Sequence, residues 1–389
     1  MAKHNPANER IKREYFLYLK GARGRDAATI DGVAKSLARF EASTGARDFK
    51  KFRHLQATSF VERLADVRNG RTGEQLSKAT MLSTLRDLRA FFDWLAFQPG
   101  FKRQIAHRDA EYFNLSDKDK AVARAVRVKD APTLEQVRHV LATMPSATPL
   151  ERRDRALVAF AAITGARGNA LASFRLRHID LAGGFVEQDA REVRTKAAKT
   201  FRTYFMACCE GALEIVADWI GELECDHLWG PADPLFPATR MGLSATGGFE
   251  AQGLERHGWK GTTPIRDIFK RAFAAADLPY FNPHSVRHML VRHAMALDVS
   301  PEQLKAWSQN LGHADVLTTF NSYGTVPVHR QGELIRTAGP APAGADWTHD
   351  TDVQALLKVI AAKAGAGRGQ AVQPTTIVPG GAGTAGEGC

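Results

Sequence analysis

The chain of 389 residues is 44% hydrophobic and 24% charged, which is typical of a globular protein and long enough for two or three domains. It contains no run of ~18 apolar residues that would span a membrane, and its first residues lack the apolar core of a secretion signal. Its four cysteines have no disulfide-like spacing, so we expect a protein of the reducing cytoplasm.

The net charge of +11 lies entirely in the first third of the chain. Residues 1–130 hold 27 Lys and Arg against 16 Asp and Glu, whereas residues 131–389 hold 26 of each. A basic segment this concentrated fits a phosphate backbone. On charge alone, a solvated basic surface is an equally good interpretation.

The first hundred residues carry apolar side chains at helical intervals. Asp26 precedes one such series and is a candidate N-cap. A clearer helix is predicted over residues 78–97, with Ser77 as its cap. Its apolar stripe consists of Met81, Leu85, Leu88, Phe92 and Leu95. Basic side chains off this stripe could contact DNA or form a solvated face: Lys78, Arg86 and Arg89.

A polar, basic stretch without a strong apolar stripe follows at residues 114–130, and we expect a linker there. Thr133 and Gln136 then have the spacing of a capping box, which predicts the start of another helix. A further helical region over residues 152–174 is interrupted by a short break at residues 164–168.

Short strands and a long loop are predicted in the middle of the chain. Gly183 and Gly184 indicate one turn and residues 197–200 a second, so a small antiparallel sheet is expected. Residues 211–223 have a helical pattern. The Pro- and Gly-rich residues 228–253 are expected to be largely loop.

Helices are predicted to resume near Pro264 and to continue to about Tyr323. From Gly339 the sequence is rich in Ala, Gly and Pro, and we expect disorder there apart from a short helix near residues 352–364. These patterns together predict a mainly helical protein with one small sheet.

Six polar residues in the second half of the chain have the chemistry that cleavage of a phosphodiester requires. They are Arg167, Lys196, His284, Arg287, His313 and Tyr323. Arginine holds non-bridging oxygens through parallel hydrogen bonds and stays charged, while other basic groups can protonate the leaving oxygen. Tyrosine can attack phosphorus, although its reference pKa of ~10 means that it needs a positive pocket.

His284 and Arg287 give the strongest local signal, because residues three apart lie on one face of a helix and can meet the same phosphate. A His-x-x-Arg-His string is weak by itself. It gains force from His313, which follows Leu-Gly, and from Tyr323 beyond it. Tyr280 is a poor alternative nucleophile because it precedes the motif.

These motifs resemble those of the tyrosine recombinases, also called the phage integrase family, over about residues 10–335. Family members typically show a Thr-Gly-x-Arg turn, a lysine at a β-hairpin, His-x-x-Arg, Leu-Gly-His and then a tyrosine. The resemblance implies phosphate binding by Arg167, Arg287 and His313, proton transfer by Lys196 and His284, and attack by Tyr323.

Three points depart from the family pattern or leave a choice open. The family often has an acidic residue three positions after the first arginine, where this chain has Ala170. Ten residues separate His313 from Tyr323, whereas nine is more usual. We favour Lys196 as the proton donor, and Lys199 is the alternative.

The resemblance also implies a mainly α-helical fold with a small antiparallel sheet in the catalytic domain (α+β), arranged as a two-domain DNA clamp. The expected divisions are a helical DNA-binding domain over 1–112, a linker over 113–130, a catalytic domain over 131–335 and a disordered tail over 336–389. Double-stranded DNA is the implied partner, and the implied assembly is a homotetramer on two DNA sites. Accessory DNA-bending or directionality proteins are compatible with this scheme.

No cofactor is expected, because the phosphotyrosyl link conserves bond energy. The chain has no GxxxxGK[ST] loop for ATP. Four residues could be considered as zinc ligands: Cys208, Cys209, Cys225 and His227. They lack the paired CxxC spacing of a structural zinc site, so we expect the cysteines to be buried or idle thiols.

The leading hypothesis is therefore a site-specific DNA recombinase that works through a 3′-phosphotyrosyl intermediate. Two alternatives remain open. One is a resolving or relaxing enzyme with the same tyrosine chemistry. The other is a non-catalytic DNA-binding protein of the same fold, which Ala170 and the ten-residue spacing favour.

Overall fold

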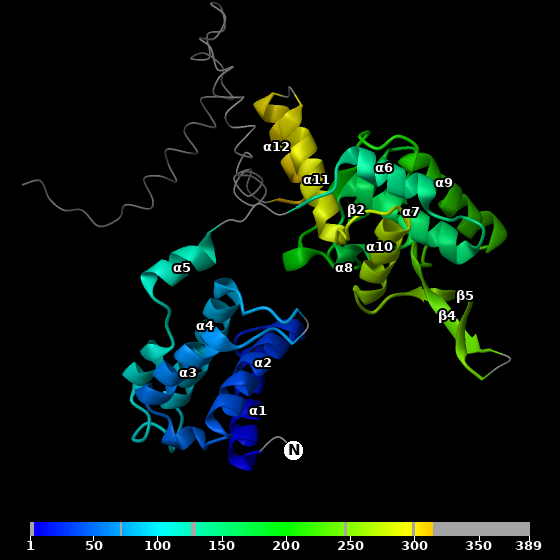
Figure 1. Ribbon diagram of the computed structural model, residues 1–389. Helices are drawn as coiled ribbons and strands as arrows, with labels where there is room; N and C mark the ends of the chain where they lie inside the picture. Colours follow the sequence, from blue (N-terminus) through cyan, green and yellow to red (C-terminus); the bar gives the residue numbers. More distant parts are fainter. Residues whose placement is uncertain (1–3, 71, 126–129, 245–246, 298–299, 314–389) are drawn as a thin grey trace, which may run out of the picture. The chain divides into compact units, whose positions relative to one another are not determined.

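The computed structural model describes residues 4–70, 72–125, 130–244, 247–297 and 300–313 (Figure 1). Tyr323 and the predicted tail lie outside the described residues. The chain divides into two compact units, Met1–Arg127 and Val128–Cys389. Each unit has its own hydrophobic core.

The described part of the first unit is a bundle of helices around an aromatic core (Figure 1). Phe52 and Phe92 stack in this core with ring centroids 3.8 Å apart. Asp26 and Ser77 cap the second and fourth helices, which confirms both predictions. The helices are α1 (Pro6–Gly21), α2 (Ala27–Thr44), α3 (His54–Asp66), α4 (Lys78–Ala96) and α5 (Asp117–Arg124), with short turns η1 (Phe49–Lys51) and η2 (His107–Tyr112).

Helix α5 lies within the stretch that the sequence predicts to be a linker. Ser116 caps it by accepting a hydrogen bond from Asp119 N at 3.1 Å. Lys78 on α4 forms a salt bridge with the Asp119 carboxylate at 3.1 Å. Since α5 buries none of its side chains, no apolar stripe marked it in the sequence.

The second unit packs helices around α7 and adds two small antiparallel sheets (Figure 1). Nearly all of α7 from Ala156 to Thr164 is buried. The predicted fold class, mainly α with a small antiparallel sheet, is confirmed. The helices are α6 (Leu134–Thr143), α7 (Pro149–Thr164), α8 (Gly168–Leu171), α9 (Ala212–Gly221), α10 (Thr263–Ala275), α11 (Pro283–Ala296) and α12 (Pro301–Asn310).

The first sheet has the order β1-β2-β3, with every pairing antiparallel. Gly184, with φ of 69°, forms the predicted turn between β1 and β2. The turn between β2 and β3 contains two alanines in the left-handed region, Ala197 and Ala198. The strands are β1 (Ile179–Asp180), β2 (Phe185–Gln188) and β3 (Phe201–Tyr204), with short helical turns η3 (Leu176–His178), η4 (Lys196–Ala198) and η5 (Glu222–Asp226).

The expectation that residues 228–253 are largely loop agrees with residues 228–236, which lie in no named helix or strand, and is wrong beyond them. Strands β4 (Pro237–Leu243) and β5 (Phe249–Gly258) pair as an antiparallel hairpin with two register shifts. The buried side chain of Arg153 on α7 holds the base of this hairpin, donating to Pro237 O at 2.9 Å and to Thr239 Oγ1 at 3.0 Å. This tertiary anchor outweighs a composition that is typical of loops.

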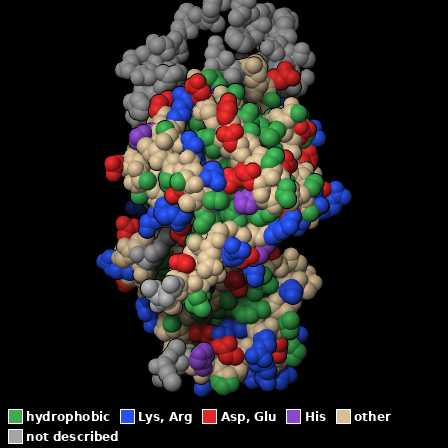
Figure 2. All heavy atoms as spheres, turned by 90° about the vertical axis from the view of Figure 1, so that its right-hand side faces the viewer, with side chains coloured by type: hydrophobic (Ala, Val, Ile, Leu, Met, Phe, Trp, Pro, Cys, Tyr) green, Lys and Arg blue, Asp and Glu red, His purple; other side chains and the backbone are tan. Residues whose placement is uncertain are grey.

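No helix in the described ranges is long and apolar enough to cross a membrane. Figure 2 shows one face of the molecule, on which Lys and Arg side chains are interspersed with acidic ones.

Candidate active site

Arg167 follows a tight turn at the end of α7. Thr164 Oγ1 accepts a hydrogen bond from Ala166 N at 3.2 Å, and Gly165 ends the helix with φ of 59°. A Cβ atom on Gly165 would lie 2.8 Å from Leu311 Cδ2, so only glycine fits there. Arg167 stands at the N-cap position of α8, with extended backbone angles and a half-buried side chain. The predicted break in the helix is confirmed, and it changes the direction of the chain just before Arg167.

Arg287 lies on α11 and is only 2% exposed. One of its terminal nitrogens, Nη1, donates to Gly165 O at 3.1 Å. The other, Nη2, donates to Leu311 O and lies 2.8 Å from His313 Nε2. These contacts join α11 to the turn before Arg167 and to the turn after α12, so the guanidinium is held in one orientation.

His313 is 9% exposed and takes its place from the turn after α12, where its backbone N–H donates to Ser308 O at 3.1 Å. Burial, together with the smaller effect of the charges of nearby basic groups, lowers the pKa of His313 to about 3. Those groups are Arg287, Arg167, Lys199 and His284. His313 is therefore neutral at physiological pH.

The tautomer of His313 follows from its contact with Arg287. A guanidinium has only donors, so His313 Nε2 accepts and the one proton of the neutral ring lies on Nδ1. The site thus combines a charged donor, the Arg287 guanidinium, with a neutral donor, His313 Nδ1–H. Both suit a phosphate oxygen.

Lys196 lies in η4, between β2 and β3, and Lys199 follows directly after it. Both side chains are exposed. Lys199 is close enough for its charge to lower the pKa of His313. The position of Lys196 on the predicted hairpin is as expected, and the choice between the two lysines stays open.

Strand β3 is fixed to the turn that carries His313. The side chain of Asn310 accepts from Tyr204 N at 2.6 Å through Oδ1 and donates to Tyr204 O at 2.9 Å through Nδ2. Gly312 has φ of 67°, and a Cβ atom there would lie 2.5 Å from Phe201 Cζ. Sequence reasoning missed Asn310, because its contact spans a hundred residues and follows no motif.

His284 lies in the first turn of α11, where its backbone N–H donates to the cap residue Asn282 at 2.9 Å. Its exposed ring is 4.9 Å from the ring of His288, edge to face. The predicted helical turn bearing His284 and Arg287 is confirmed. The site therefore gathers basic residues from α8, α11, the β2–β3 turn and the end of α12, whereas Tyr323 lies outside the described residues.

Ala170, which replaces the acidic residue often found in the family, is 1% exposed and packs in the core of the second unit. Cys208 and Cys209 are also buried, and burial raises the pKa of the Cys208 thiol to about 11. Cys225 is exposed. Among the described residues, no group of three or more His, Cys, Asp and Glu side chains is arranged to hold a metal ion.

Comparison with known proteins shows the family of this chain. Residues 132–329, about half of the chain, match the Phage integrase family. The chain belongs to this family, the tyrosine recombinases, and is a site-specific recombinase, an enzyme that breaks and rejoins DNA.

Among curated relatives, the chain is similar to the tyrosine recombinase XerC of Xylella fastidiosa strain M23, with 27% identity over 80% of this chain and 90% of the relative. It is 23% identical to XerC of Escherichia coli O157:H7, over 78% of this chain and 88% of the relative.

Two solved structures share the fold. The XerH site-specific recombinase, bound to a palindromic difH substrate in a post-cleavage complex, has a TM-score of 0.56 and 17% identity over 82% of each chain. A lambda integrase dimer bound to a COC′ core site has a TM-score of 0.53 and 12% identity, covering 82% of this chain and 99% of that one.

Proposed function

We propose that Tyr323 is the nucleophile with which this recombinase cuts and rejoins duplex DNA. The contact between Arg287 and His313 carries the proposal, because it sets a fixed guanidinium beside a neutral imidazole in a strongly basic environment. Such donors stabilise the charge that develops on the non-bridging oxygens during phosphoryl transfer. Arg167 supplies a second guanidinium to the same phosphate.

In the first step, Tyr323 Oη attacks phosphorus and forms a P–O bond while the bond from phosphorus to O5′ breaks. The electron pair of that bond goes to O5′, which takes a proton from Lys196, or from Lys199 in its place. His284 accepts the phenolic proton. The products are a 3′-phosphotyrosyl link and a free 5′-hydroxyl.

In the second step, the 5′-hydroxyl of a partner strand attacks the phosphotyrosyl link and releases Tyr323. The same groups act in reverse, so His284 returns the proton to the phenolate. Because each new bond replaces one of equal kind, the exchange needs no ATP.

The first unit is proposed to bind the DNA backbone, since residues 1–130 hold the whole excess of positive charge. A DNA-binding region over 1–112, a linker over 113–130, a catalytic region over 131–335 and a separate tail over 336–389 complete this scheme. We further propose a homotetramer on two DNA sites, acting in the cytoplasm, with accessory proteins setting direction. The DNA-bound lambda integrase and XerH structures support duplex DNA as the partner.

Trapping the covalent adduct tests the proposal. Nicked suicide duplexes tiled across the DNA that flanks the gene are incubated with the protein, without ATP or metal. Denaturing gels and peptide mass spectrometry are expected to show DNA linked to Tyr323. The adduct should disappear with Tyr323→Phe and persist with Tyr280→Phe, which alters an exposed tyrosine before α11.

Binding to these duplexes without an adduct would instead support a non-catalytic DNA-binding protein. An adduct on another residue would overturn the assignment of Tyr323. If the adduct forms but supercoils are only relaxed and no strands are exchanged between two duplexes, the enzyme is of the resolving or relaxing type.

A further inference from the structure

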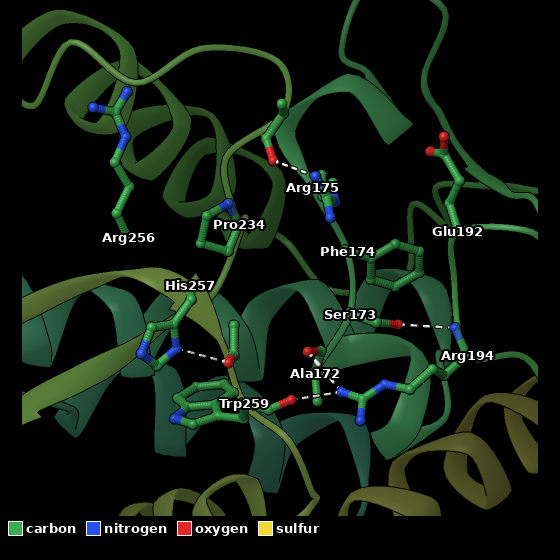
Figure 3. Close-up of a pocket in the computed structure, with 12 residues that line it drawn as sticks. Ala172, Ser173, Phe174, Arg175, Glu192, Arg194, Pro234, Arg256, His257 and Trp259 are labelled. Carbon is green, nitrogen blue, oxygen red and sulfur yellow. Dashed lines mark hydrogen bonds between the residues drawn. The ribbon is translucent and has the colours of Figure 1, made fainter.

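The segment that leads into the β2–β3 turn is tied down by an arginine outside the six candidate residues. Arg194 lies two residues before Lys196. Its Nη1 donates to Lys260 O at 2.6 Å, and its Nη2 donates to Trp259 O at 2.6 Å and to Ala172 O at 2.9 Å. Figure 3 shows this guanidinium reaching across to Ala172 and Trp259. Arg194 is one of the residues that line a pocket of about 330 Å³.

The backbone of Arg194 is held as well. Its N–H donates to Ser173 Oγ at 2.9 Å, and Ser173 follows Ala172 at the end of α8 (Figure 3). These four hydrogen bonds leave the residue little rotational freedom, although its side chain is exposed. The start of the turn that carries both lysines (residues 196–200, the lysine turn) is therefore fixed to the end of α8, the short helix that follows Arg167.

The segment after β5 belongs to the same assembly. Trp259 and Lys260 connect β5 to α10, and a Cβ atom on Gly168 would lie 3.2 Å from Thr262 Cγ2. The connection thus packs directly against the N-terminus of α8. Arg194 therefore joins the segment before Lys196 to the end of α8 and to the connection between β5 and α10.

The other end of the lysine turn is anchored to the residues around His313. Thr200 Oγ1 accepts from Ala190 N at 3.1 Å, and β3 beyond it is held by Asn310. The exposed turn at residues 196–200 is consequently held at both ends. Arg194 fixes the first end to the segment that follows Arg167, and Asn310 fixes the strand after the second end to the turn that carries His313.

We propose that Arg194 is a positioning residue that sets the reach of the catalytic lysine toward the leaving O5′ atom. This inference rests on the proposed function. A displacement of about 1 Å in a proton donor can cost about 100-fold in rate. Arg194 is not required to touch the DNA; it acts through the backbone that leads into Lys196.

The test compares two suicide duplexes on the sequence at which the wild-type protein forms its adduct. One has oxygen at the 5′-bridging position of the scissile phosphate and the other has sulfur. A thiolate leaves without a proton, so a defect confined to proton delivery disappears on the sulfur duplex. Lys196→Ala and Lys199→Ala identify which lysine shows this rescue.

Arg194→Gln is expected to slow adduct formation on the oxygen duplex by about 100-fold and to cleave the sulfur duplex close to the wild-type rate. Arg194→Lys, which keeps the charge but loses the planar fork, should fall between the two. Arg191→Gln is the matched control, because it removes an exposed arginine from the same segment, paired only locally with Asp189. It should cleave both duplexes normally.

Equal slowing of Arg194→Gln on both duplexes, or no slowing on either, would overturn the positioning role. If Arg194→Gln proves unstable by thermal unfolding, Arg194→Lys decides by the same ratio of rates. Failure of the proposed function looks different, since the wild-type protein would then form no Tyr323 adduct on any duplex.

Discussion

Arg287 contacts the turn before Arg167 and the turn that carries His313. Arg287→Lys keeps the positive charge, yet one ammonium cannot bond Gly165 O, Leu311 O and a phosphate with the same geometry. We expect adduct formation at Tyr323 to fall by at least ~100-fold while duplex binding persists. Arg271→Lys, on an exposed arginine of α10, is the control. Equal losses in both variants would contradict the assignment.

The protonation of His313 predicts a pH dependence of stability. Its pKa is about 3 in the folded protein and near 6.5 when unfolded, so between these values the unfolded state binds more protons. The stability that His313 contributes is present above pH 6.5 and is lost as the pH falls toward 3. The difference in urea midpoint between wild type and His313→Gln should therefore narrow from pH 7 to pH 4.5. His257→Gln, at an exposed histidine, is the control substitution.

At the level of elements, the contact between β3 and the end of α12 sets the position of His313. Gly312→Ala places a methyl group against the Phe201 ring and requires φ of 67° from alanine. We expect a loss of about 2–3 kcal/mol in the free energy of unfolding and a marked loss of adduct formation. Gly211→Ala has φ of 74° but meets no atom within 4 Å, so it should cost only the backbone strain. Denaturant titration of both variants separates the clash from the strain.

The lysine turn stores backbone strain, because Ala197 and Ala198 have φ of 59° and 49°. Glycine relieves this strain at the cost of a more disordered unfolded chain. We expect Ala197→Gly to raise the free energy of unfolding by about 0.5 kcal/mol. Ala182→Gly, at an exposed turn residue with negative φ, relieves no strain and should lower the free energy of unfolding. A loss of stability in Ala197→Gly would show that the turn relaxes in solution.

How far the sequence predicts these elements depends on where each draws its stability. Helix α4 was predictable because its cap and its apolar stripe lie within one segment. The β4–β5 hairpin was not predictable, because Arg153 from the distant helix α7 anchors its base. In the site, the spacing of His284 and Arg287 predicted a shared helical face. The bonds from Arg287 to Leu311 and from Arg194 to Trp259 join distant segments, and no local pattern encodes them.

For the whole molecule, the two separate cores and the uneven charge predict a division of labour in DNA binding. A chain limited to residues 128–389 should bind duplex DNA more weakly than the full chain. Its affinity should also depend less on salt, by about 0.9 in the log–log slope for each phosphate that the shortened chain no longer neutralises. Fluorescence anisotropy at several salt concentrations measures both quantities. An unchanged slope would place the phosphate-binding residues in the second unit.

Arg287 and Arg194 both donate to main-chain carbonyls, at Gly165 and Leu311 for Arg287 and at three positions for Arg194. Every amino acid carries a carbonyl, so no exchange of side chain can delete one of these acceptors. Most residues that neighbour the two arginines can therefore be substituted during evolution without changing the orientation of either guanidinium, provided that the backbone keeps its path. The amino acid itself must be kept only where the backbone path requires a particular residue, as it does at Gly165.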